Sequence, residues 1–431
     1  MELAGVLVLV VVFVVLLLMG VPIAFSIGIA AICTMLVSMD PMPALTTAAQ
    51  RMATGLDSFA LLAIPFFILA GQLMNRGGIA RRLIDFAKSL VGTLPGALAH
   101  VNIVAAMFFG AISGSAVASA SAVGGIMVPR MDEEGYDRAY GAAVNITSAT
   151  TGLIIPPSNI LIVYSLASGG VSIAALFLAG YLPGIVVGLS LMIVAGVIAH
   201  RRKYPRADRV RLSVTFRRFL DALPSLFLLI VVIGGIVAGI FTATEASAVA
   251  VAYSFVLALI YREISPKDLP SILLDTVSTT AIVMLLIGTS MALSWVMSYE
   301  NIPQNVATTL VSLSDSPIVI LLIINLVLLC VGTFMDMTPA VLIFTPIFLP
   351  IVIEMGMDPV HFGIMMVLNL CVGLCTPPVG SVLFVGCGIA GVPITQVIRP
   401  LLPFFAAMII ALLIVTFVPD LSLWLPRAFG F

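Results

Sequence analysis

The amino-acid sequence predicts an all-α polytopic membrane protein, and its composition, apolar runs and internal repeat all support this. The chain has 431 residues, of which 61% are hydrophobic and 9% charged, and its mean hydropathy is +1.24. Soluble proteins carry about a quarter charged residues. A membrane-spanning helix needs about 20 apolar residues, and such runs recur here, whereas a β-barrel would show alternating segments of about ten. The composition excludes soluble disorder and nucleic-acid binding.

The first apolar run, residues 3–19, is predicted to be a retained helix and not a signal peptide. It begins Met-Glu-Leu, without a basic segment, and no small-residue cleavage site follows it. With the next run, 21–39, it begins a set of N-terminal scaffold helices that we place at residues 1–57.

The basic residues predict the orientation in the membrane. Eight of the 19 Lys and Arg residues lie between 201 and 218, whereas residues 300–361 contain none. Basic loops are enriched on the cytoplasmic side. We therefore expect a cytoplasmic loop at 200–218, an outer location for 300–361, and both termini in the periplasm.

The sequence contains an internal repeat with a spacing of 221 residues (373 minus 152). Gly-Leu-Ile-Ile-Pro-Pro at 152–157 matches Gly-Leu-Cys-Thr-Pro-Pro at 373–378, and Glu-Gly-Tyr-Asp at 134–137 matches Met-Gly-Met-Asp at 355–358. Each repeat reads as a span, an amphipathic segment, a hairpin and a span broken by two prolines. The predicted divisions are N-terminal scaffold helices (1–57), repeat 1 (58–170), connecting scaffold helices (171–275), repeat 2 (276–392) and a C-terminal helix (393–431).

The two hairpins, 95–130 and 316–350, lie in opposite charge environments. A path through the spans is consistent only if both hairpins are re-entrant and open to opposite sides. This predicts inverted repeats, in which substrate and coupling ions bind near the midplane at interrupted helices.

Polar residues cluster at the predicted hairpin tips. The first tip, Ser113-Gly114-Ser115, favours a ligand-binding role, with close helix packing of small residues as the alternative. The second tip contains Asp336, a carboxylate in an apolar run. Asp336 is an ion ligand, a proton carrier or a cap of the following helix.

The broken spans supply freed carbonyls that can bind a hard cation such as Na⁺, and half-helix N-termini that can attract an anion. Cys371 and Cys375 have no neighbouring His or carboxylate, so we interpret them as core residues and not metal ligands. Glu245 is most simply a first-turn carboxylate at a helix N-terminus.

Six motifs together resemble the large membrane subunit of TRAP (tripartite ATP-independent periplasmic) transporters, the DctM or SiaM type. They are Gly-Val-Pro-Ile-Ala-Phe-Ser-Ile-Gly from 20, Phe-Phe-Gly-Ala-Ile-Ser-Gly-Ser-Ala (108–116), Gly-Leu-Ile-Ile-Pro-Pro-Ser (152–158), Thr-Ala-Thr-Glu-Ala (242–246), Gly-Thr-Phe-Met-Asp (332–336) and Thr-Pro-Pro-Val-Gly (376–380).

The resemblance implies an elevator-type secondary transporter in the bacterial inner membrane that uses a Na⁺ gradient to import organic acids. It also implies two partners, a small four-helix membrane subunit and a periplasmic substrate-binding protein. No cofactor is expected besides Na⁺ as the coupling ion.

The resemblance further implies three groups of site residues. The first sodium site would comprise Ser113, Ser115, Gly152, Ile155 and Pro157. The second would comprise Gly332, Thr333, Gly373 and Thr376. The substrate would contact Gly114, Asn145, Thr150, Ser158, Asn369 and Pro377.

Three other functions predict different features. A channel would not need inverted hairpins with buried tips. A stand-alone carboxylate symporter or antiporter would keep the fold without the binding protein. An intramembrane enzyme would need catalytic His, Asp or Ser motifs, and none stands out in the sequence. We therefore expect a transporter and not an enzyme.

Overall fold

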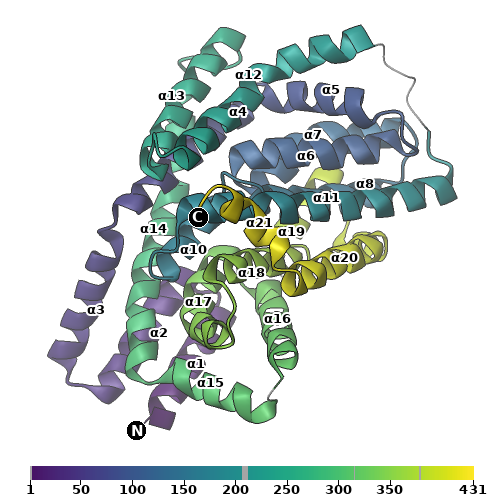
Figure 1. Cartoon of the computed structure of the whole chain (residues 1–431). Helices are drawn as coiled ribbons and strands as arrows, with labels where there is room; N and C mark the ends of the chain where they lie inside the picture. The colour runs from purple at the N-terminus through teal and green to yellow at the C-terminus, as the bar shows by residue number, and fades with distance from the viewer. Residues whose placement is uncertain (1, 206–211, 315, 378–379) are drawn as a thin grey trace.

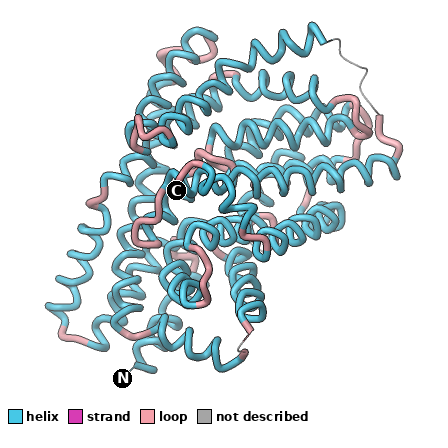
Figure 2. The backbone as a smooth tube through the Cα atoms, viewed as in Figure 1, coloured by secondary structure: helices cyan, strands magenta, loops and turns pink. Residues whose placement is uncertain are grey.

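The computed structural model describes residues 2–205, 212–314, 316–377 and 380–431, and within these ranges it is helical without strands (Figure 2). Eight helical segments of the described chain are long and apolar enough to cross a membrane, and a bent pair of shorter segments raises this to nine. The prediction of an all-α polytopic membrane protein is confirmed.

The N-terminal part forms one side of the molecule. Its helices are α1 (Glu2–Leu18), α2 (Ile23–Ser38) and α3 (Pro41–Leu56). α1 packs on α2, and both α2 and α3 pack along the long helix α14 (Leu269–Tyr299) (Figure 1).

The two repeats fold into the same order of helices. Repeat 1 contains η1 (Phe59–Leu62), α4 (Ala63–Arg76), α5 (Ile79–Val91), α6 (Ala97–Ser113), α7 (Ala116–Glu133), α8 (Arg138–Ala149), α9 (Thr151–Ile154) and α10 (Asn159–Ala167). Repeat 2 contains α14, α15 (Ile302–Leu313), α16 (Pro317–Phe334), α17 (Met337–Glu354), α18 (Pro359–Leu374) and α19 (Ser381–Ala390). In both repeats a candidate span, a short helix, a helical hairpin and an interrupted helix follow one another, the first span being η1 with α4 in repeat 1 and α14 in repeat 2.

Local backbone conformation repeats at the same spacing as the sequence. Gly135 and Gly356, the turn residues after each hairpin, have left-handed φ values of +84° and +83°. Asp137 caps α8 by accepting from the Ala139 N–H, and Asp358 caps α18 by accepting from the Val360 N–H, each at 2.8 Å. A cap of this kind fixes where a helix begins, so the two interrupted helices start from the same local structure.

The predicted amphipathic segment 76–92 contains α5. Ile79, Leu83 and Phe86 are buried, as the spacing indicates, while Leu90 at the end of the helix is 48% exposed. Arg82 stacks on the ring of Tyr261, with its guanidinium carbon 3.5 Å from the ring centroid. The helix is therefore held by contacts on two of its sides.

Three helices connect the repeats, and two follow the second: α11 (Ile173–Arg202), α12 (Leu212–Val237), α13 (Ala243–Tyr261), α20 (Ile394–Phe417) and α21 (Asp420–Ala428). Glu245 forms a capping box with Thr242 at the start of α13, which confirms the capping interpretation.

Two predicted segments differ from the structure. The loop 200–218 is shorter than predicted, because α11 continues to Arg202 and α12 begins at Leu212; residues 206–211 lie outside the described part of the chain. The C-terminal segment contains two helices and not one, because the chain leaves helical geometry at Val418 before α21 begins.

The two repeats interlock. α10 of repeat 1 packs on α17 of repeat 2, α19 of repeat 2 packs on α7 and α8 of repeat 1, and α9 packs on α18. The Cys371 thiol lies 3.6 Å from the carbonyl oxygen of Thr150, its own counterpart at the 221-residue spacing. The two counterpart positions therefore meet where α18 packs on the first interrupted helix.

Candidate functional site

Each hairpin crosses its own interrupted helix at a pair of glycines. A Cβ atom on Gly110 of α6 would lie 2.3 Å from the Cα of Gly152 in α9. In the second repeat, a Cβ atom on Gly373 would lie 2.6 Å from the Cα of Gly332. Small residues permit such close backbone approach between membrane helices. Three of the predicted sodium-site residues, Gly152, Gly332 and Gly373, therefore lie at these crossings.

The first hairpin turns at Ser113-Gly114-Ser115, as predicted. α6 ends at Ser113, Gly114 has a left-handed φ of +60°, and the Ser115 hydroxyl accepts from the Ala118 N–H at 3.3 Å to cap α7. A Cβ atom on Gly114 would lie 3.2 Å from the carbonyl oxygen of Pro157. The tip therefore sits directly against the break of the first interrupted helix.

The first break lies at residues 155–158, and the flanking helical segments are bent by 51°. In a continuous helix, the carbonyls of Gly152 and Leu153 would accept from residues 156 and 157, but both are prolines without an N–H. The Ser158 hydroxyl donates to the Leu153 carbonyl at 2.6 Å. The prolines therefore take the usual helical donor from the carbonyl of the predicted ligand Gly152, whereas the Ile155 N–H still donates to the Thr151 carbonyl at 3.0 Å.

The second break lies between the end of α18 at Leu374 and the start of α19 at Ser381. The Thr376 N–H donates to the Gly373 carbonyl at 2.9 Å, and its hydroxyl donates to the Val372 carbonyl at 2.8 Å. Pro377 is exposed, and Pro378 lies outside the described residues. The two breaks thus occupy equivalent positions but differ in their hydrogen bonds.

The second hairpin turns at Asp336, between α16 and α17. Asp336 occupies the N-cap position of α17, yet its carboxylate accepts no capping hydrogen bond within the described structure. Its Oδ1 atom instead accepts from the Ser381 hydroxyl at 3.5 Å. The Thr333 hydroxyl donates to the Cys330 carbonyl of its own helix at 2.7 Å. The carboxylate faces a cavity and also interacts with the backbone N–H groups of Met337 and Thr338, so its geometry suits both an ion ligand and a helix cap.

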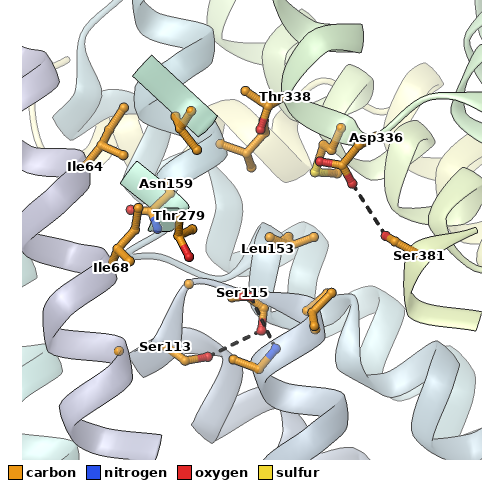
Figure 3. A pocket seen from close by; sticks show the side chains of 18 of the residues that line it. Ile64, Ile68, Ser113, Ser115, Leu153, Asn159, Thr279, Asp336, Thr338 and Ser381 are labelled. Carbon is orange, nitrogen blue, oxygen red and sulfur yellow. Dashed lines mark hydrogen bonds between the residues drawn. The ribbon is translucent and has the colours of Figure 1, made fainter. Parts of the chain in front are cut away.

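A cavity of about 250 Å³ lies between the two hairpin tips (Figure 3). Ser113 and Ser115 lie on one side of it, and Asp336 and Ser381 on another. α4, α10 and α14 contribute four further polar side chains that were not predicted from the sequence: Gln72, Asn75, Asn159 and Thr279. Their polarity inside apolar helices is the signal that could have found them.

Of the six predicted substrate-binding residues, only Gly114 lies in this cavity lining, and the other five, including the exposed Pro377, lie outside it. Asn145, Thr150, Ser158 and Asn369 are almost fully buried in helix packing. Asn145 donates to the Ala120 carbonyl at 3.1 Å. The Oδ1 atoms of Asn145 and Asn369 accept no hydrogen bond within the described part of the chain, which is unusual for buried polar atoms.

A buried polar pair recurs in the two repeats. The Ser148 hydroxyl donates to Asn102 Oδ1 at 3.5 Å, and Asn369 Nδ2 donates to Asn325 Oδ1 at 2.8 Å. Ser148 and Asn369 are 221 residues apart, and Asn102 and Asn325 are 223 apart. Asn369 therefore belongs to a pair that links the interrupted helix α18 to the hairpin helix α16.

The donor atoms near the tips and breaks are hydroxyl, carbonyl and carboxylate oxygens. Hard cations such as Na⁺ fit such ligands, whereas zinc and copper favour nitrogen and sulfur. No group of three or more His, Cys, Asp or Glu side chains comes together in the part of the chain that the structure describes. The residues fit an alkali cation in donor chemistry.

Comparison with solved structures agrees with the fold. The YdaH transporter of Alcanivorax borkumensis superposes with a TM-score of 0.65 over 90% of both chains, at 13% sequence identity. The architecture is therefore one that a membrane transporter adopts.

Known protein sequences are more similar to this chain than the YdaH sequence is. An uncharacterized protein, YgiK, from Salmonella typhimurium is 57% identical over 97% of this chain and 96% of its own length. The C4-dicarboxylate TRAP transporter large permease protein DctM of Pseudomonas aeruginosa is 43% identical over 87% of this chain and 88% of its own. Residues 10–421 match the family described as tripartite ATP-independent periplasmic transporter, DctM component. The Pseudomonas relative is a transporter permease and not an enzyme, and the chain belongs to the DctM family of TRAP transporter large permease proteins.

Proposed function

We propose that this permease imports a small organic acid, such as a dicarboxylate, sialic acid or a similar carboxylate, across the bacterial inner membrane, driven by a sodium gradient. The family membership supports transport, and the Pseudomonas relative is named for C4-dicarboxylates. The observation that carries the proposal is the cavity between the two hairpin tips, to which Ser113, Ser115 and Asp336 contribute.

The proposed sodium sites lie where each hairpin tip meets an interrupted helix. Ser113, Ser115, Gly152, Ile155 and Pro157 would provide the first site. Their support is the contact of Gly114 with the Pro157 carbonyl and the Gly110–Gly152 crossing. When bound, Na⁺ would supply positive charge beside a carboxylate substrate.

Gly332, Thr333, Gly373 and Thr376 would provide the second site. Asp336, which lies next to them in the chain and faces the cavity, is proposed as an additional ligand. The support is the position of its carboxylate in the cavity lining, where it accepts from the Ser381 hydroxyl.

The substrate would bind in the cavity, against Gly114 and the hydroxyl and amide groups around it. The other predicted substrate-binding residues would influence binding from positions outside the cavity lining: Asn145, Thr150, Ser158, Asn369 and Pro377. The Oδ1 atoms of Asn145 and Asn369 are buried and accept no hydrogen bond within the described residues. Helix packing alone does not explain such polar atoms, which supports a role in binding substrate.

The proposed mechanism is an elevator built from inverted repeats, with both termini in the periplasm. Its support is the matched helix order, the turns at Gly135 and Gly356, and the opposite charge of the segments beside the two hairpins. Interlocked hairpins and interrupted helices would move as one body because they bury one another's surfaces.

Two partners are proposed: a small four-helix membrane subunit and a periplasmic substrate-binding protein. Family membership supports both. Large apolar side chains of α1, including Leu7 and Leu18, are exposed, which suits contact with lipid or a membrane subunit.

Uptake of labelled organic acid into proteoliposomes tests the proposal. The vesicles contain both membrane subunits, and the binding protein is supplied outside. Uptake should require an inward sodium gradient and the binding protein together. Equal uptake with a proton gradient would contradict sodium coupling, and uptake without the binding protein would favour the stand-alone symporter or antiporter.

A further inference from the structure

A second cavity, open and of about 810 Å³, lies where the start of α8, the end of α11 and the start of α20 meet. Asp137 and Tyr140 line it from α8, Arg201 and Arg202 from α11, and Arg399 from α20. It shares no lining residue with the cavity between the hairpin tips, and the proposed transport function does not use it.

The carboxylate in this cavity already has partners. Asp137 Oδ1 accepts from the N–H groups of Ala139 and Tyr140, and Asp137 Oδ2 accepts from Arg202 Nη1 at 3.3 Å. Arg202 also donates to the Tyr204 hydroxyl at 3.2 Å and lies over the Tyr140 ring. The charge of Arg202 is therefore balanced by Asp137.

The positive charges of Arg201 and Arg399 are not balanced by an ion pair. Both are exposed, and neither forms a salt bridge with a carboxylate of the described chain. Two free guanidinium groups in one cavity favour an anionic ligand. Arginine binds phosphate oxygens with paired N–H donors, which makes phosphate the best-matched chemistry.

Exposed apolar side chains lie near both arginines along their helices. Val197 and Ile193 lie four and eight residues before Arg201 on the same face of α11, and are 49% and 67% exposed. On α20, Leu402 lies three residues after Arg399 and is 57% exposed. α11 and α20 pack together, and both are candidate membrane spans. A free phosphate ion would gain nothing from these side chains, whereas acyl chains would cover them.

We propose that the arginine cavity, defined by Arg201, Arg202 and Arg399, binds the phosphate headgroup of an anionic phospholipid. The acyl chains lie along Ile193, Val197 and Leu402. Basic pockets between membrane helices at a bilayer surface commonly hold such headgroups. The inference requires only that this end of α11 lies at a membrane surface, so it stands independently of the transported substrate.

Native mass spectrometry of the purified full chain in detergent tests this binding. Phosphatidylglycerol and phosphatidylcholine are titrated separately, and the variant Arg201→Gln/Arg399→Gln is compared with the unsubstituted chain. Each basic residue near a lipid surface contributes enough that the double variant should bind phosphatidylglycerol roughly 30-fold more weakly. Phosphatidylcholine, with no net charge, should bind weakly to both proteins.

The matched control is Arg81→Gln/Arg217→Gln, which removes two exposed arginines that form no salt bridge in the described chain. It should bind phosphatidylglycerol within about twofold of the unsubstituted chain. Equal weakening in this control would mean that only overall charge matters and would overturn the site. Displacement of the lipid by equimolar inorganic phosphate would assign the cavity to a free anion.

A thermal unfolding measurement guards against a misfolded variant. Phosphatidylglycerol should raise the unfolding temperature of the unsubstituted chain but not that of the double variant. If the double variant does not fold, the single variant Arg399→Gln should still lose roughly fivefold in affinity. Unchanged affinity in a folded variant contradicts the proposal.

Discussion

Gly110 and Gly152 touch backbone to backbone, so that a Cβ atom on either would lie 2.3 Å from the Cα of the other. The hairpin helix α6 therefore packs closely on α9, next to the break at Pro156-Pro157. Gly332 and Gly373 make the corresponding crossing in the second repeat. These crossings leave no room for a side chain, which makes them sensitive points for mutation.

Gly152→Ala should impair both stability and uptake. The added methyl group must separate α6 from α9, and overpacking of this kind costs about 1–3 kcal/mol. We expect a lower unfolding temperature and uptake reduced by roughly tenfold, as measured in proteoliposomes. Gly125→Ala is the control, because a Cβ atom there meets nothing within 4 Å. Similar losses in both variants would contradict the close-packing explanation.

Asp336→Asn should weaken sodium dependence while leaving the fold intact. The amide keeps the shape of the side chain but removes its charge from the cavity, and a hydrogen bond or contact to a charged group contributes about 1.5–3 kcal/mol. The sodium concentration for half-maximal uptake should rise by roughly 10- to 100-fold.

The control for this change is Asp57→Asn, an exposed aspartate away from the cavity lining. Its sodium dependence should match that of the unsubstituted chain. If Asp336→Asn also leaves the sodium dependence unchanged, the carboxylate is not a ligand of the coupling ion.

The proposed inverted orientation predicts labelling from opposite sides. Ser213 and Thr308 are both exposed, the first at the start of α12 and the second in α15. A membrane-impermeant maleimide should label Thr308→Cys from the periplasmic side and Ser213→Cys only in inverted vesicles. Labelling is measured as the increase over the unsubstituted chain. Reaction of both positions from one side would exclude the proposed topology.

Asp358→Ala should destabilise the protein by about 1 kcal/mol, because it removes the cap of α18. Asp358→Asn should retain most of the stability, since asparagine is an equally good cap. The free energy of unfolding in detergent distinguishes the two. Equal losses would show that the negative charge of Asp358, and not its hydrogen bond to the Val360 N–H, is what matters.

The sequence predicted the turns and breaks accurately because their causes are local. Gly114 permits the left-handed turn at the first tip. Pro156 and Pro157 lack a backbone N–H whatever the surrounding structure, so they interrupt the helix. The capping role of Glu245 likewise depends on Thr242, three residues away. Each of these features is set by residues that are close together in the chain.

Cavity residues from distant helices could not be predicted in the same way. Gln72 and Thr279 reach the cavity from α4 and α14, and their positions depend on how whole helices pack. Asn369 points to Asn325 and lies outside the cavity lining. Local sequence does not encode which face of a buried helix meets a hairpin, so these assignments required the tertiary structure.

The exchange of α10 and α19 between the repeats has a consequence for folding and ancestry. Each half leaves its last helix against the other half, and Thr150 touches its own counterpart, Cys371. The molecule is thus organised like a domain-swapped dimer whose two subunits are joined in one polypeptide chain. Neither half can complete its core alone, so the second repeat must be synthesised before the first is fully folded.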